Sequence, residues 1–274
     1  MGAGVPAKGC EAAPKNIPIY ATIPPLSFST ATGSSMSVPF VHLRVHSEFS
    51  LVDGLVRIKP LAKALAGMNM PAVAITDQSN MCSLVKFYKT AMGAGIKPIC
   101  GADLWLAAAD PEAPLSRICF LAMNPKGYRN LTELISRGWT EGQRNGLVIL
   151  QREWIAPASE GLIALSAGKE GDIGMALLAG RQDEAEALLQ DWMAMFPERF
   201  YVEVQRTNRA RDEEYVHAAV ALADRFGAPL VATNDVSFYQ AIGLRCSTKP
   251  AYASVRAGPL TTRAVQGCTA TSST

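Results

Sequence analysis

The chain has 274 residues, of which 49% are hydrophobic and 18% are charged, and its net charge is +2. This composition is typical of a globular protein with one large core or two small ones. It neither requires nor excludes a nucleic-acid partner, because no run of Lys and Arg is long enough to indicate a basic face. There is no apolar run of about 18 residues and no signal peptide pattern, so we expect a cytoplasmic protein that makes no membrane contact.

The six cysteines show no CxxC motif and no paired spacing. Three of them, Cys82, Cys100 and Cys119, lie in apolar runs. We therefore expect small buried side chains in a reduced protein, in preference to disulfides or a zinc site.

The chain divides into three regions. Residues 1–35 are rich in Ala, Gly, Pro, Ser and Thr and lack periodicity, which is typical of a disordered extension. We expect this extension to lie upstream of the true start at Met36. Residues 36–240 have the pattern of a folded domain. The pattern stops there, and we expect 241–274 to be an aperiodic tail that results from a frameshift or sequencing error.

Between residues 36 and 240, segments with strand and helix periodicity alternate. Val41, Leu43 and Val45 alternate with polar residues as in a strand, and Pro60 opens a helix. Further strands are expected at 72–76, 118–122, 162–165, 200–204 and 230–233. Further helices are expected at 81–92, around 128–135, and at 173–178, 184–195 and 213–226. This alternation predicts an α/β fold with a parallel sheet, either open or closed into a barrel.

Polar side chains follow several of the expected strands. Ligands of parallel α/β proteins bind at the C-terminal ends of the strands. Five such ends carry Asp, His, Asn or Thr, namely 42–53, 76–80, 101–103, 205–207 and 233–237. Together they predict a shared polar cleft. One Asp after a strand is often only the N-cap of the next helix, and we expect that role for Asp77.

Four segments carry a resemblance to a known family: FVHLRVHSEFSLVDGL, MPAVAITDQSNMCSLVKFYKTAMGAGIKPICGADL, NPKGYRNLTELISRGW and PLVATNDVSF. They resemble the PHP (polymerase and histidinol phosphatase) domain with which bacterial replicative polymerases of the C family begin, and the resemblance covers nearly all of 37–240. It implies a distorted (β/α)7 barrel, here incomplete at its C-terminal end. Active members of the family hold up to three metal ions, which generate a hydroxide nucleophile and bind the phosphate.

The resemblance also places the family's metal ligands on this sequence. His46, Asp53 and Asp235 match ligand positions, and Asp103 replaces a Glu. The ligand is lost at five positions: Arg44, Gln78, Arg117, Thr207 and Ser237. An Arg side chain does not deprotonate in proteins and cannot bind a metal, so we expect Arg44 and Arg117 to pair with the remaining carboxylates. The result would be a vestigial site without catalytic residues or a cofactor, holding at most one weakly bound divalent ion.

The resemblance implies that the chain is a fragment of a DNA-directed DNA polymerase, a nucleotidyltransferase that uses Mg²⁺ in a palm absent from these residues. Two functions stay open. The first is a non-catalytic scaffold that binds the proofreading 3′–5′ exonuclease subunit, while DNA and the other replicase subunits bind the missing C-terminal part. The second is a metal-dependent PHP phosphoesterase or pyrophosphatase.

Overall fold

The computed structural model describes residues 40–245, except for 52, 109–112, 208 and 241–242. The expected disordered extension at 1–35 lies outside the described residues, and so does the expected tail apart from 243–245. Among the described residues, no helix has both the length and the apolar character needed to cross a membrane.

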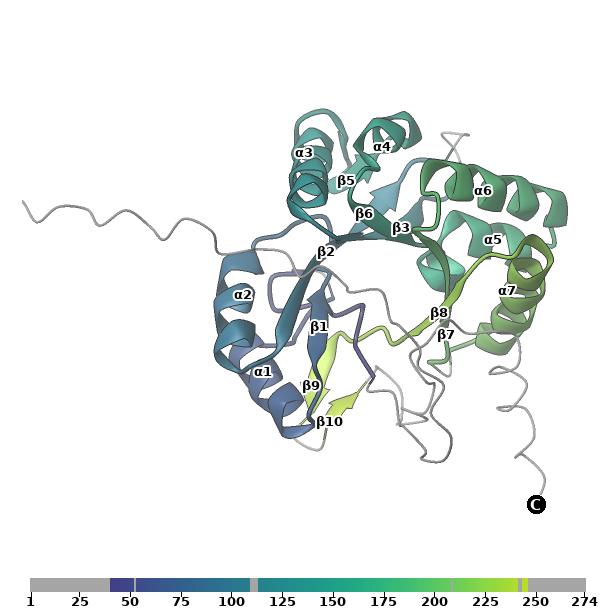
Figure 1. Cartoon of the computed structure of the whole chain (residues 1–274). Coiled ribbons are helices and arrows are strands. Elements are labelled where there is room, and N and C mark those ends of the chain that lie inside the picture. The colour runs from purple at the N-terminus through teal and green to yellow at the C-terminus, as the bar shows by residue number, and fades with distance from the viewer. Residues whose placement is uncertain (1–39, 52, 109–112, 208, 241–242, 246–274) are drawn as a thin grey trace, which may run out of the picture.

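Helices and strands alternate along most of this part of the chain (Figure 1). The helices are α1 (Ile58–Gly67), α2 (Leu84–Gly93), α3 (Pro125–Glu141), α4 (Arg152–Ala158), the 3₁₀ helix Gly168–Glu170, α5 (Asp172–Leu178), α6 (Gln182–Met195) and α7 (Asp212–Phe226). The strands are β1 (Ala72–Ile75), β2 (Lys97–Leu106), β3 (Ser116–Ala122), β4 (Gln143–Arg144), β5 (Leu147–Leu150), β6 (Leu162–Leu165), β7 (Phe200–Gln205), β8 (Leu230–Thr233), β9 (Phe238–Gln240) and β10 (Gly243–Arg245).

The main sheet has the order β4-β5-β2-β3-β6-β7-β8, and β1 pairs with the first half of β2. Strand β3 runs antiparallel to both of its neighbours, β2 and β6. The pairs β1–β2, β2–β5, β6–β7 and β7–β8 are parallel, as the alternating pattern predicted. The reversal of β3 brings its first residues, not its last, to the edge where the parallel strands end.

The regular strands do not close into a complete ring. The segment 42–46 spans the gap between β1 and the chain after β8 through isolated bridges, from His42 to Val73 and from Val45 to Val236. The His46 amide donates to the Val236 carbonyl oxygen at 2.9 Å, and the Ala74 amide donates to the His42 carbonyl oxygen at 2.8 Å. The architecture is therefore an α/β barrel whose ring of regular strands is incomplete, as expected.

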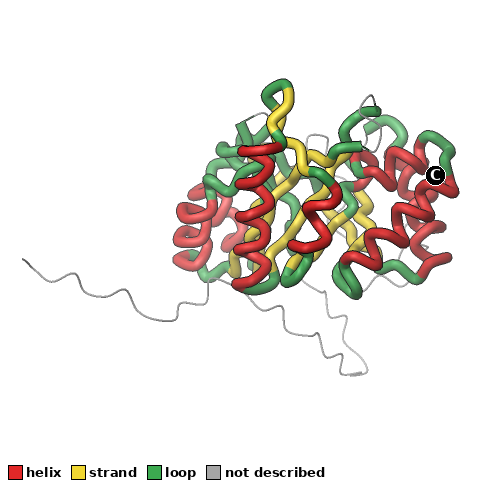
Figure 2. Tube along the Cα trace, turned by 90° about the horizontal axis from the view of Figure 1, so that it is seen from above, coloured by secondary structure: helices red, strands yellow, loops and turns green. Residues whose placement is uncertain are grey.

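The helices surround the strands (Figure 2). Helices α1 and α2 pack against each other beside β1 through Leu61, Leu65, Phe87 and Ala91. The other helices share a larger core with the remaining strands. The sequence determines where α3 begins. The Asn124 side chain accepts a hydrogen bond from the Gly127 amide, and proline follows at the first helical position.

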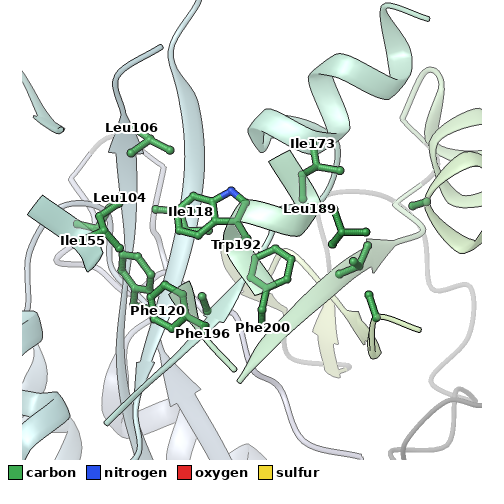
Figure 3. Close-up of a cluster of buried hydrophobic side chains, with 14 of the residues drawn as sticks. Leu104, Leu106, Ile118, Phe120, Ile155, Ile173, Leu189, Trp192, Phe196 and Phe200 are labelled. Carbon is green, nitrogen blue, oxygen red and sulfur yellow. The ribbon is translucent and has the colours of Figure 1, made fainter. Parts of the chain in front are cut away.

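The centre of the larger core is aromatic (Figure 3). Trp192 of α6 stacks on Phe200 of β7 with ring centroids 5.8 Å apart, and Phe120 of β3 stacks on Phe196 at 5.7 Å. All four side chains are shielded from solvent. Large aromatic rings bury more apolar area than other side chains, so this cluster is a main source of the hydrophobic stabilisation of the barrel.

The structure differs from the sequence-based expectations in four places. Strand β2 was not predicted as a strand of ten residues, because it is buried on both faces and shows no alternation. The β4–β5 hairpin and α4 were also missed; each is too short to show a period. Regular structure continues beyond Gln240, since β10 pairs with β9, which corrects the expectation that the pattern ends there.

Candidate functional site

The polar residues that follow the strands meet at one end of the barrel. The segment 42–46, β1, β7 and β8 all end there, and β3 begins there because it is antiparallel. Nine charged or titratable side chains form what we call the mouth network, four of them cationic and five carboxylate: Arg44, His46, Arg117 and Arg209 with Asp53, Asp103, Glu170, Glu203 and Asp235. Polar side chains that follow the strands thus meet in a network of ion pairs.

Arg44 occupies the middle of this network. Its Nη2 donates to Asp103 Oδ2 at 2.5 Å, and its Nη1 lies 3.7 Å from Glu203 Oε2. All three side chains are buried. Burial would lower the pKa of Arg44, but the negative charges of Asp103 and Glu203 hold that pKa well above its usual value. The guanidinium therefore stays charged, and it neutralises carboxylates inside the barrel.

His46 links two carboxylates. Its Nδ1 lies 2.8 Å from Asp53 Oδ2, and its Nε2 lies 3.2 Å from Asp103 Oδ2. Burial alone would lower the pKa of His46, but the contacts with Asp103 and Asp53 raise it from 6.5 to about 9. For Asp53, burial acts to raise the pKa, and the hydrogen bond with His46 lowers it to about 2. At neutral pH the imidazole is therefore protonated; its Nδ1 donates to Asp53, and its Nε2 forms an ion pair with Asp103. A protonated imidazole has no lone pair for a metal.

Arg117 lies at the outer edge of the same group. Its Nη1 donates to Glu170 Oε2 at 2.9 Å and lies 3.6 Å from Asp103 Oδ2, and its Nη2 lies 3.6 Å from Asp53 Oδ2. Its guanidinium also stacks over the Trp105 ring, 4.7 Å from the centroid. Arg117 thus holds together carboxylates from three separate segments of the chain.

The loop that carries Asp53 is fixed by short polar contacts. Ser50 Oγ donates to Asp53 Oδ1 at 2.6 Å, and the Ser47 amide and Ser47 Oγ donate to Asp77 at 2.6 and 2.9 Å. Asp77 follows β1, so its hydrogen bonds with Ser47 connect the loop to the end of that strand. The expectation that it caps the next helix is wrong, since the residue before α2 is Ser83.

The remaining predicted ligand positions are placed differently. Asp235 accepts a hydrogen bond from Arg209 Nη2 at 3.0 Å, at the edge of the network. The Thr207 amide and Thr207 Oγ1 both donate to Asp212 at the start of α7. Gln78 pairs with Asp103 through the backbone, and the carbonyl of Ser237 accepts from the Leu55 amide at 2.7 Å. The structure thus brings His46, Asp53, Asp103, Arg44 and Arg117 together.

Three members of the network were missed from the sequence. Glu203 is the only charged residue in β7, on the face that also carries Gln205, and an acidic residue inside an apolar strand was a usable signal. Thr233 Oγ1 donates a short hydrogen bond to it. Glu170 ends a 3₁₀ helix of three residues and Arg209 lies in the turn before α7, and neither segment is long enough for a periodicity to indicate which way a side chain points.

The residues at the mouth do not fit a cluster of metal ions. The described residues contain no group of three or more His, Cys, Asp or Glu side chains arranged to hold one. Of the three histidines, His46 alone lies in the network; His42 is buried against Phe40, and His217 is exposed on α7. A guanidinium about 4 Å from a divalent ion is repelled by on the order of 8 kcal/mol at an effective dielectric constant near 20. Arg44 and Arg117 thus stand where such ions would be needed.

Comparison with known proteins agrees with this architecture. The family model of the PHP domain matches residues 42–207, and the chain belongs to that family. Within it, the chain is similar to the DNA polymerase III subunit alpha of several bacteria: 75% identical over 203 residues in Pseudomonas aeruginosa, 73% over 203 residues in Pseudomonas fluorescens and 47% over 204 residues in Escherichia coli K12. These matches cover 74% of this chain and only 17–18% of each relative.

Two solved structures are more distant. An amidohydrolase from Chromobacterium violaceum, with bound sulfate and no metal, is 15% identical with a TM-score of 0.49, and the match covers 77% of this chain and 92% of that one. A putative metal-dependent phosphoesterase from Bifidobacterium adolescentis is 12% identical with a TM-score of 0.47, and the match covers 76% and 92%.

Proposed function

We propose that the chain is the N-terminal PHP part of the alpha subunit of a bacterial replicative DNA polymerase, and that it acts as a non-catalytic scaffold that docks the proofreading 3′–5′ exonuclease subunit. The observation that supports loss of catalysis is the position of Arg44, a buried guanidinium 2.5 Å from Asp103 inside the barrel mouth. Polymerisation with Mg²⁺, and the contacts with DNA and other replicase subunits, would belong to the rest of the longer protein.

The physical basis of the scaffold role is that ion pairs replace metal charge. In an active PHP domain, cations neutralise the carboxylates at the mouth and hold the strand ends together. Here Arg44, Arg117 and protonated His46 neutralise Asp53 and Asp103 in the same region. The barrel can thus keep its shape without metal, and it binds at most one weakly held divalent ion.

The alternative function is a metal-dependent phosphoesterase or pyrophosphatase. His46, Asp53 and Asp103 do lie in contact at the mouth, which is the observation in its favour. Metal analysis of the purified chain after dialysis against Mn²⁺ or Zn²⁺, together with hydrolysis assays on p-nitrophenyl phosphate and pyrophosphate, separates the two functions. We expect less than one metal ion per chain and no turnover. Metal-dependent turnover that His46→Ala abolishes would establish the alternative.

The docking role is tested by binding. The cognate exonuclease subunit is titrated into the 274-residue chain in a calorimeter, with Arg44→Met as a variant that disturbs the network. We expect a complex with the unmodified chain. If no heat is released and the two proteins also elute separately in gel filtration, the docking role is wrong, whatever the metal content of the chain.

A further inference from the structure

The part of the chain that forms α1 and α2 has an unusual charge distribution. Between Gly54 and Ala102 there are six Lys or Arg residues and one carboxylate, Asp77, which is buried and bound by Ser47. Five of the six cations are exposed: Arg57, Lys59, Lys63, Lys86 and Lys89. A helix surface that is merely solvated usually mixes charges of both signs, but α1 and α2 carry four lysines and no carboxylate of their own, which indicates an interaction.

The same region holds exposed apolar side chains. Of the seven large hydrophobic residues that are exposed in the described part of the chain, five lie between residues 51 and 92: Leu51, Leu55, Met68, Val85 and Met92. Val85 is 66% exposed and Met92 is 53% exposed. Single exposed apolar residues are common, but a group of them in one region often marks a binding surface.

Cationic and apolar side chains are interleaved on this surface. Val85, Lys89 and Met92 recur at spacings of four and three residues, which places them along one side of α2. Lys59 and Lys63 are likewise four residues apart on α1, which packs against α2. We call Lys59, Lys63, Val85, Lys86, Lys89 and Met92 the α1–α2 face.

The loop before α1 adjoins this face. Lys86 Nζ pairs with Glu48 Oε1 at 2.7 Å and lies 5.2 Å from the centre of the Phe49 ring. The loop carries Leu51, which is 90% exposed, and Leu55, which is 76% exposed. The loop that supplies Asp53 to the mouth network is therefore also connected to the α1–α2 face.

The opposite side of the barrel has the opposite charge. Figure 1 shows α1 and α2 on one side of the strands and α5, α6 and α7 on the other. Helix α6 contains four acidic and no basic residues, and α7 contains four acidic residues and Arg225. The cationic character is thus a local property of the α1–α2 face, in a chain whose net charge is only +2.

We propose that the α1–α2 face binds an acidic segment of a partner protein that also presents apolar side chains. This inference rests on the docking function proposed above and adds the surface and its chemistry. A protein partner fits better than a nucleic-acid backbone, because Val85 and Met92 lie among the lysines. A protein interface buries such apolar side chains at its centre within a polar rim, whereas phosphate contacts use the cations alone.

The test measures binding of the exonuclease subunit to the 274-residue chain by calorimetry. Three double variants change the face. The first combines Lys86→Glu with Lys89→Glu. The second combines Lys59→Glu with Lys63→Glu and leaves the Lys86–Glu48 pair intact, and the third combines Val85→Ser with Met92→Ser. The matched control is Lys126→Glu with Arg129→Glu, the same charge change at exposed sites of α3. We expect Kd to increase at least about tenfold for each face variant and less than about twofold for the control, with weaker binding at higher salt.

The outcomes separate this inference from the proposed function. If the unmodified chain binds and the face variants bind equally well, the α1–α2 face is not the docking surface, although docking stands. If the unmodified chain does not bind, both fail. Two further results would overturn the inference alone. The first is binding of a 20-nucleotide single strand or duplex that the face variants lose. The second is self-association of the unmodified chain in sedimentation that the face variants lose. Circular dichroism of each variant shows whether it is folded. If one face variant does not fold, the other two still test the inference.

Discussion

Arg44 and Asp103 form a 2.5 Å ion pair at the mouth of the barrel, with both side chains shielded from solvent. They come from segments far apart in the sequence, the chain before α1 and strand β2. Removing one member of a buried pair leaves an uncompensated charge, whereas removing both has a much smaller effect. The pair therefore couples two parts of the barrel energetically.

The first prediction concerns this coupling. Arg44→Met should lower the free energy of unfolding by about 3–5 kcal/mol, because Asp103 and Glu203 lose their buried cation. Asp103→Asn should then cost less in the Arg44→Met background than in the unmodified chain. Urea denaturation of the four proteins measures both effects. The control is Arg137→Met, which breaks an exposed pair with Glu141 and should cost less than about 1 kcal/mol. Additive effects of the two core changes would contradict the prediction.

The second prediction concerns alkaline pH. The pKa of His46 is raised from 6.5 to about 9 in the folded protein by its contacts with Asp103 and Asp53, which overcome the effect of burial. The stabilisation from protonated His46 is therefore complete below about pH 6.5 and is lost as the pH rises toward 9. Unfolding experiments between pH 6 and 9.5 should show this decline in the unmodified chain and a flatter profile in His46→Gln.

The third prediction concerns mildly acidic pH. Burial lowers the pKa of His42 from 6.5 to about 4. The contribution of neutral His42 is thus present above pH 6.5 and is lost as the pH falls toward 4. Together with His46, this places maximum stability near pH 6.5. His42→Phe should remove the acidic decline and leave the alkaline one, provided that the protein folds. An unchanged acidic limb in a folded His42→Phe chain would show that another group is responsible.

The fourth prediction concerns the loop that carries Asp53. A Cβ added to Gly54 would lie 1.9 Å from the Ser47 carbonyl oxygen, so Gly54→Ala must displace the loop. We expect a loss of about 1–3 kcal/mol of stability and a lower pKa of His46, because Asp53 moves away from the imidazole. Thermal unfolding and NMR titration of the histidines measure the two effects. Gly93→Ala in α2, where a Cβ meets open space, is the control and should be neutral or slightly stabilising.

Periodicity and motif together predicted the alternating architecture and the clustering of His46, Asp53, Asp103, Arg44 and Arg117. They could not predict strand direction. Arg117 reaches the mouth because β3 is antiparallel, so its early residues lie where parallel strands end. A single sequence does not encode that reversal in any pattern of apolar residues. Glu170 and Arg209 were missed because they lie in a three-residue 3₁₀ helix and in a turn, which are too short to show a periodicity.

The α1–α2 face shows a different limit of sequence reasoning. Lys86 and Lys89 taken one at a time look like ordinary solvated helix residues. Helix α1 packs beside α2, so the exposed lysines of α1, Lys59 and Lys63, are carried by the helix next to the one that exposes Val85 and Met92. The signal was present in the sequence as the near absence of acidic residues between Gly54 and Ala102.

The bridges that join His42 to Val73 and Val45 to Val236 also set an order of events during synthesis. A ribosome releases the segment 42–46 long before residue 236. Helices α1 and α2 can form and pack with β1 while translation continues, but the first strand segment has only one of its two neighbours until β8 has emerged. In a growing chain, the first barrel segment to be made is therefore among the last to be enclosed.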